Sequence, residues 1–160
     1  LARGHPGQVT PMADDEKNFS AEEREAMKEA AADKRKSRSR ARKTPEDVRA
    51  EGLADLEAAI AKLPDAGDRE LSAALHDLVS EVAPELVPRT YYGMPAWGKD
   101  GKVLCFFQPA SKFKVRYGTF GFEPISNLDD GTMWPTAYAL LDLTPANRKL
   151  LTERIRLAVS

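Results

Sequence analysis

The fold is decided by residues 91–107, which read YYGMPAWGKDGKVLCFF. The last five, Val103–Phe107, are apolar at every position, which predicts a central strand covered on both faces. Before them, Gly98-Lys99-Asp100-Gly101 predicts a hairpin turn, because Asp-Gly tolerates the positive φ that tight turns require. The aromatic run from Tyr91 to Trp97 predicts one further strand, which lies at an edge or bends at Pro95. Two strands joined by so short a turn form an antiparallel pair.

Two more strands are predicted downstream. Lys112–Phe122 alternates over its first half, with Phe113, Val115 and Tyr117 on one face and Lys112, Lys114 and Arg116 on the other. Residues 127–131 form a turn, and Met133–Leu143 gives a last strand with Pro135 near its start.

Helices are predicted on either side of these strands. Thr44-Pro45 caps a helix whose apolar stripe is Leu53, Leu56, Ile60 and Leu63. A second helix follows Asp68 and ends before Pro84, and Thr144-Pro145 caps a C-terminal helix with the stripe Leu151, Ile155, Ala158 and Val159. This order predicts a two-layer α+β domain, with an antiparallel sheet of about four to five strands and helices on one face.

The 160 residues predict one compact domain at residues 45–160. Residues 1–11 precede a plausible initiator at Met12 and are interpreted as an added segment. Residues 12–44 are interpreted as a polar, basic arm, helical from the capping box Ser20–Glu23 or partly disordered. The net charge of −1 hides a split: residues 1–44 carry 11 basic and 8 acidic side chains, and the rest carry 13 and 17.

The composition also favours some classes of protein over others. A single cysteine, Cys105, excludes an intramolecular disulfide framework and is usual in a reducing compartment, so a cytoplasmic protein is expected. The longest uncharged stretch, 131–141, is too short to span a membrane. No phosphate loop or paired acid/base pattern occurs, and Cys105 sits in an apolar strand, which favours a non-enzyme, monomeric or weakly dimeric.

The motif Tyr92-Gly93-Met94-Pro95, with Trp97, the 101–107 strand, Lys112-Phe113-Lys114 and Gly121-Phe122, resembles the YdhG-like family of domains of unknown function. The resemblance covers residues 50–159, and residues 133–138 look like a subgroup variant. It implies an α+β domain, and part of that family has been assigned a frataxin-like iron-chaperone role. The resemblance carries over the Tyr92–Pro95 motif and no iron ligand.

The sequence therefore predicts a binding or chaperone module without a resident cofactor, which handles iron by resemblance or binds a small anionic ligand at the sheet face. The proposed ligand set combines the cationic stripe with the aromatic loop: Tyr92, Gly93, Met94, Trp97, Lys112, Lys114, Arg116 and Trp134. Three like charges on one strand face repel and need solvent or an anion. The alternatives are an ordinary solvent-facing stripe and a loop that only shapes a bend.

For a metal such as iron, the available ligands are Asp129 and Asp130, with Glu123 or Asp142 nearby. Their spacing matches no metal loop, and a solvated turn is the alternative interpretation. His76, without a histidine or cysteine at ligand spacing, is expected to be structural.

A different class of function depends on the arm. Residues 34–43 hold seven basic side chains that can neutralise phosphates, which makes a nucleic-acid-associated accessory protein the alternative. These residues are Lys34, Arg35, Lys36, Arg38, Arg40, Arg42 and Lys43. The competing interpretation is a solubilising helix face paired with the glutamates upstream.

Overall fold

Helices precede, interrupt and follow a run of strands in residues 18–160, the part of the chain that the computed structural model describes. The elements are α1 (Ala21–Arg40), α2 (Pro45–Ala61), α3 (Ala66–Val82), β1 (Val87–Tyr91), β2 (Met94–Lys99), β3 (Lys102–Gln108), α4 (Ala110–Phe113), β4 (Gly118–Phe122), β5 (Ala137–Leu140) and α5 (Pro145–Val159). The segment 1–11 and Met12, singled out in the sequence, lie outside the described residues.

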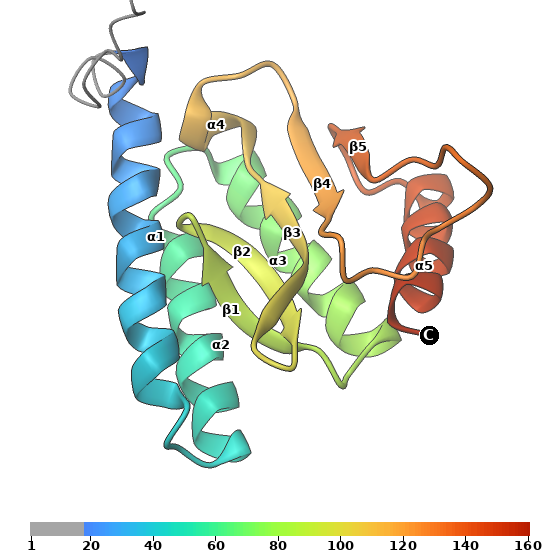
Figure 1. The fold of residues 1–160 in the computed structure, drawn as a ribbon. Helices are drawn as coiled ribbons and strands as arrows, with labels where there is room; N and C mark the ends of the chain where they lie inside the picture. The colour runs from blue at the N-terminus through green and yellow to red at the C-terminus, as the bar shows by residue number, and fades with distance from the viewer. Residues whose placement is uncertain (1–17) are drawn as a thin grey trace, which may run out of the picture.

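The strands form one antiparallel sheet in the order β1-β2-β3-β4-β5 (Figure 1). α2 and α3 lie behind this sheet, and α5 packs against α3. α1 runs beside α2 and contacts the edge strand β1. The predicted α+β class with helices packed against an antiparallel sheet is therefore confirmed.

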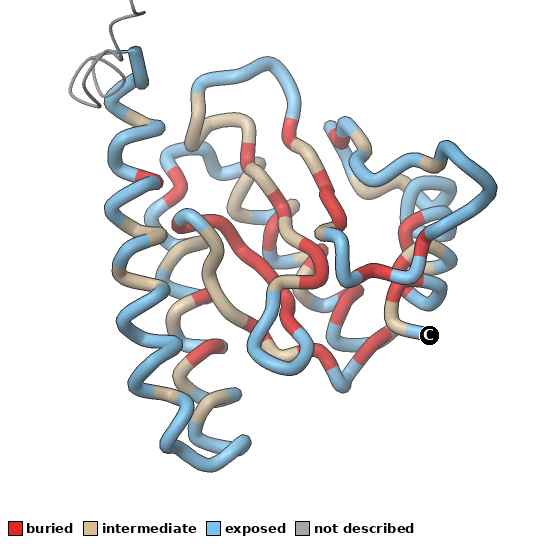
Figure 2. Tube along the Cα trace, in the orientation of Figure 1, coloured by how far each residue is buried: buried red, intermediate tan, exposed pale blue. Residues whose placement is uncertain are grey.

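The core lies between the sheet and the helices behind it (Figure 2). Its largest enclosed side chains are Trp97, Phe107 and Phe120, which pack with leucines of α2 and α3. The Trp97 indole Nε1 donates to His76 Nδ1 at 3.2 Å, and the two rings stack. His76 therefore satisfies a buried donor, which confirms the structural role expected for it.

Helix boundaries follow the caps that the sequence predicts. The Thr44 and Thr144 hydroxyls accept from backbone N–H groups at the starts of α2 and α5, and Pro occupies the first helical position in both. α3 begins earlier than expected, at Ala66, because Asp65 is its N-cap and Asp68 already lies in the first turn. β5 is shorter than the strand predicted from Met133 to Leu143.

The prediction of one strand from Tyr91 to Trp97 is wrong. A two-residue turn at Tyr92 and Gly93, with φ of 52° and 74°, divides this run between β1 and β2. Pro95 is tolerated because bonded and non-bonded pairs alternate along β1–β2, and the pairing of β2 with β3 begins only at Ala96. The Asp100-Gly101 turn between β2 and β3 is confirmed, with positive φ at both residues.

The prediction of a strand from Lys112 to Phe122 is also wrong. The β3–β4 register pairs Gln108 with Thr119, so the residues between them must connect the strands. They form the short helix α4, which ends at Lys114 in the left-handed region with φ of 53°. Within the predicted range, only Gly118–Phe122 is strand. Gly121 of this strand lies against the Phe106 ring of β3, since a Cβ there would lie 2.4 Å from that ring.

Candidate functional site

α1 is attached to the rest of the fold mostly by polar contacts. Its capping box at Ser20 and Glu23 forms as predicted, and the helical alternative for residues 21–40 is the one observed. Among its residues only Ala26 is buried. Near its start, Glu29 pairs with Lys112 at 3.0 Å and Glu22 pairs with Lys114 at 2.7 Å.

The predicted cationic stripe therefore does not exist. Lys112 and Lys114 are not on a strand, and each is already paired with a glutamate of α1. Arg116 is exposed and lies over the Tyr117 ring at 5.0 Å. These three cations do not form a joint anion site, because the alternation that suggested one belongs to a helix and a connection.

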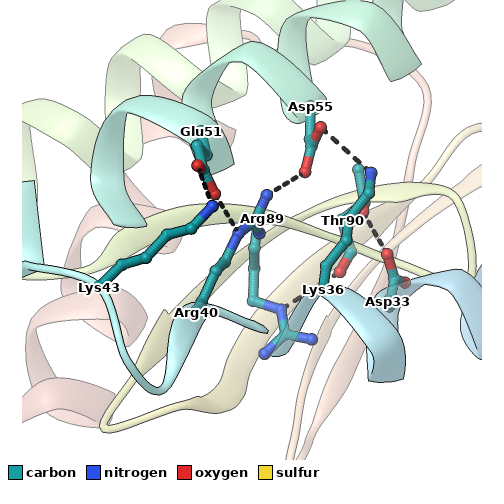
Figure 3. Close-up of polar contacts among 8 residues, drawn as sticks. All are labelled: Asp33, Lys36, Arg40, Lys43, Glu51, Asp55, Arg89 and Thr90. Carbon is teal, nitrogen blue, oxygen red and sulfur yellow. Dashed lines mark hydrogen bonds and ion pairs between the residues drawn. The ribbon is translucent and has the colours of Figure 1, made fainter. Parts of the chain in front are cut away.

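The far end of α1 carries a second set of ion pairs, with α2 (Figure 3). Arg40 contacts Glu51 at 3.0 Å and Asp55 at 2.5 Å, and Lys36 contacts Asp55 at 3.2 Å. Burial acts to raise the pKa of Asp55, but the hydrogen bonds from Arg40 and Lys36 outweigh it and hold that pKa below its ordinary value. Lys43 also pairs with Glu51 at 2.5 Å.

These pairs occupy three of the seven cations proposed for nucleic acid, namely Lys36, Arg40 and Lys43. The other four, Lys34, Arg35, Arg38 and Arg42, are exposed. Part of the basic tract thus serves to hold α1 on α2. The nucleic-acid interpretation stays a prediction that depends on the remaining four.

Among the cavities that α1 lines, two share residues of β1 and of the β2–β3 turn, and their volumes are about 250 Å³ and about 490 Å³. They share four lining residues, Asp33 and Ser37 of α1, Arg89 of β1 and Gly101 of the β2–β3 turn. We call this pair of cavities the α1 groove. Tyr91, Tyr92, Val103, Pro124 and Ile125 add aromatic and apolar surface to the larger cavity, and Val48, Val87 and Pro88 add apolar surface to the smaller.

Arg89 contributes a half-buried positive charge to the α1 groove. Its Nε donates to the Thr90 carbonyl at 3.2 Å, and its Nη1 donates to the Gly101 carbonyl at 3.3 Å. A guanidinium has five N–H donors, so these bonds leave three for another acceptor. No carboxylate in residues 18–160 forms an ion pair with Arg89. Burial lowers the pKa of Arg89, and the nearby Asp33 carboxylate opposes that shift.

Asp33 brings the opposite charge to the same groove from α1. Its Oδ1 accepts from the Thr90 hydroxyl at 2.6 Å. Its Oδ2 is buried and has no hydrogen-bond partner within the described part of the chain. Burial is the main cause that raises the pKa of Asp33, and the bond from Thr90 opposes it. Asp33, which lines the groove, thus retains an unpartnered buried oxygen, and Arg89 retains N–H donors.

The structure divides the ligand set predicted from the sequence: Gly93, Lys112 and Lys114 line one further cavity beside α1, of about 540 Å³, and the other five residues do not. Trp97 and Met94 are 1% and 5% exposed and belong to the protein interior, so the prediction that they contact a ligand is wrong. Trp134 packs against the core cluster. Gly93 is a buried turn residue whose added Cβ would meet Glu29, and Tyr92, 40% exposed, is the one member that lines the α1 groove.

Arg89, Asp33 and Tyr91 were not identified from the sequence. A usable signal existed for two of them, since alternation along Val87–Tyr91 places Arg89 and Tyr91 on the same face of a strand. For Asp33 no local signal existed, because its position against Thr90 depends on a contact across 57 residues.

The structure gives the metal candidates no assembled site. Asp129 and Asp130 are exposed, and nowhere in residues 18–160 do three or more His, Cys, Asp or Glu side chains gather as metal ligands. Cys105 is fully enclosed, and burial raises the pKa of its thiol, which keeps it protonated.

Within the described residues, none of the helices combines the length and the apolar character needed to cross a membrane.

Comparison with known proteins leaves the family open. No protein-family model, curated protein or solved structure matches this chain.

Proposed function

We propose that this chain is a binding module for a small organic anion, with the α1 groove as the site and Arg89 as the anchor of the anionic group. The observation that carries the proposal is the state of Arg89. It is half-buried, it lines both cavities, and it bonds only to neutral carbonyl groups within residues 18–160. A buried charge without a charged partner is costly, and an anionic ligand offsets that cost.

The surroundings of Arg89 fit such a ligand. Lys34 of α1 and Lys102 of β3 line the larger cavity and add positive charge to that of Arg89, whereas Glu123 and Asp33 each add a negative charge. Tyr91, Val103 and Ile125 offer aromatic and apolar surface to the body of the ligand. A volume of about 490 Å³ lies within the range of small-molecule sites, which are mostly apolar with a few placed polar groups.

This proposal keeps the sequence-based expectation of a small anionic ligand and moves its anchor from Lys112, Lys114 and Arg116 to Arg89. Iron handling, which the YdhG-like resemblance implies, remains a separate prediction. A non-catalytic role also remains a prediction, because the proposal concerns only what the groove binds.

Calorimetric titration with 3-phenylpropionate, benzoate and inorganic phosphate tests the proposal. We expect 3-phenylpropionate to bind, and Arg89→Gln to weaken it by roughly tenfold or more, since hydrogen bonds to charged groups contribute about 1.5–3 kcal/mol. Arg49→Gln is the matched control, because Arg49 also donates to two backbone carbonyls, those of Leu86 and Glu85, but lines neither cavity.

Two outcomes would contradict the proposal. One is the absence of binding for every anion in the panel. The other is equal binding by the Arg89→Gln and Arg49→Gln variants, which would place the anion elsewhere on the chain.

A further inference from the structure

The α1 groove presents a charged pair that does not neutralise itself. Asp33 and Arg89 line the same two cavities, and the Asp33 charge influences Arg89, yet no ion pair forms between them. Instead, Thr90 holds one oxygen of Asp33 through its hydroxyl and accepts from Arg89 through its carbonyl (Figure 3). One residue therefore positions both charges and leaves each with unused bonding capacity.

The unused hydrogen-bonding groups of Asp33 and Arg89 are of opposite kinds, one an acceptor and the other donors. Asp33 retains a buried acceptor, Oδ2, which lacks a partner in residues 18–160, and a buried acceptor without a donor is destabilising. Arg89 retains N–H donors. A ligand that satisfies both must offer a donor and an acceptor close together.

Resting on the proposed function, we infer that the ligand is a zwitterion of the α-amino acid type, whose carboxylate bonds Arg89 and whose ammonium group bonds Asp33. An α-amino acid carries both charged groups on one carbon atom, as a groove that is lined by both Asp33 and Arg89 requires. Its side chain would lie on Tyr91, Val103 and Ile125, so an aromatic or large apolar side chain is preferred.

A different ion would suit the groove less well. A simple carboxylate satisfies Arg89 but leaves Asp33 Oδ2 unbonded and brings two negative charges together. A simple amine satisfies Asp33 but adds a positive charge beside Arg89. A ligand with both groups meets both residues with opposite charges and without repulsion.

Three probes of matched shape separate these cases. L-Phenylalanine has both charged groups, 3-phenylpropionate lacks the ammonium group, and phenethylamine lacks the carboxylate. We expect the unaltered chain to bind phenylalanine about tenfold or more tightly than either single-charge probe, by calorimetry. This comparison needs no variant and so does not depend on the folding of one.

Asp33→Asn then assigns the preference to one residue. It should weaken phenylalanine by about tenfold and strengthen 3-phenylpropionate, because a negative charge leaves the neighbourhood of the bound carboxylate. The control is Asp77→Asn on the exposed surface of α3, which should change neither affinity. Amide resonances of Asp33, Arg89 and Tyr91 should shift on titration and locate the binding.

The outcomes distinguish the inference from the proposal beneath it. If 3-phenylpropionate binds through Arg89 as tightly as phenylalanine, or if Asp33→Asn shifts the two affinities in the same direction, the zwitterion is wrong and the anion site stands. If none of the three probes binds, both are wrong.

Discussion

Gly52→Ala is expected to destabilise the fold, although alanine is the better helix former. Gly52 lies in α2, where the helix crosses β1, and a Cβ there would lie 2.0 Å from the Pro88 carbonyl oxygen. Ordinary contact begins at 3.4 Å, so α2 and β1 would have to separate by about 1.4 Å. The obstacle is backbone, which cannot rotate away as a side chain can.

Two opposing free energies decide the result. Replacing glycine by alanine in a helix interior stabilises by about 1 kcal/mol. Overpacking a core contact costs about 1–3 kcal/mol, and more where backbone must move. Because backbone must move here, the upper part of that cost applies, about 2–3 kcal/mol. We therefore expect a net loss of about 1–2 kcal/mol in the free energy of unfolding, or about 2–8 °C in Tm for a chain of this size.

Urea denaturation followed by circular dichroism measures this loss. Ala54→Gly, at an exposed position of the same helix, measures the helix-propensity contribution alone and should cost about 1 kcal/mol. A Gly52→Ala variant as stable as the unaltered chain, or more stable, would refute the claim that α2 and β1 are in backbone contact.

Three further perturbations test other contacts. Gly93→Ala should cost slightly more than the about 1–2 kcal/mol of a left-handed alanine, because its Cβ would also displace the Glu29 carboxylate from its ion pair with Lys112. Gly131→Ala has the same backbone strain but an added Cβ there meets open space, so equal losses in urea would argue against the α1 contact. Burial raises the pKa of Asp33 above its ordinary value of 3.8, so the stability that this carboxyl contributes is present below pH 3.8 and is lost as the pH rises. The Tm of Asp33→Asn minus the Tm of the unaltered chain should therefore grow with pH, and a constant difference would contradict this. His76→Leu leaves the Trp97 indole N–H without its acceptor and should cost about 1–3 kcal/mol, and an unchanged denaturation midpoint would disprove the structural role.

Much of the fold could be predicted because its signals are local. The Thr44-Pro45 and Thr144-Pro145 caps and the Asp100-Gly101 turn each depend on a few adjacent residues. The turn at Tyr92 was missed for the same reason. An aromatic residue in an aromatic run suggests a strand, and a positive φ is uncommon for such a side chain. Nothing adjacent indicates that the chain reverses there.

The errors at the candidate site have a different cause. Alternation at Lys112–Tyr117 is a real pattern, but a strand also needs a partner, and the pairing of Gln108 with Thr119 leaves none for these residues. Asp33 and Arg89 line the same groove only because α1 packs on β1. Charge pairing between segments far apart in the sequence decides that packing, and no period within either segment encodes it.

On the proposed function, the sparse burial of α1 would give ligand affinity an indirect control. Because α1 buries one residue and is otherwise held mostly by ion pairs and by the Thr90–Asp33 hydrogen bond, we expect this wall of the groove to exchange between docked and undocked positions. Apparent affinity is the intrinsic affinity multiplied by the docked fraction. Salt should therefore weaken binding in two ways, because it screens the attraction between Arg89 and the ligand and also weakens the ion pairs that hold α1. A substitution at Glu51 or Asp55 should change the affinity although neither residue contacts the ligand.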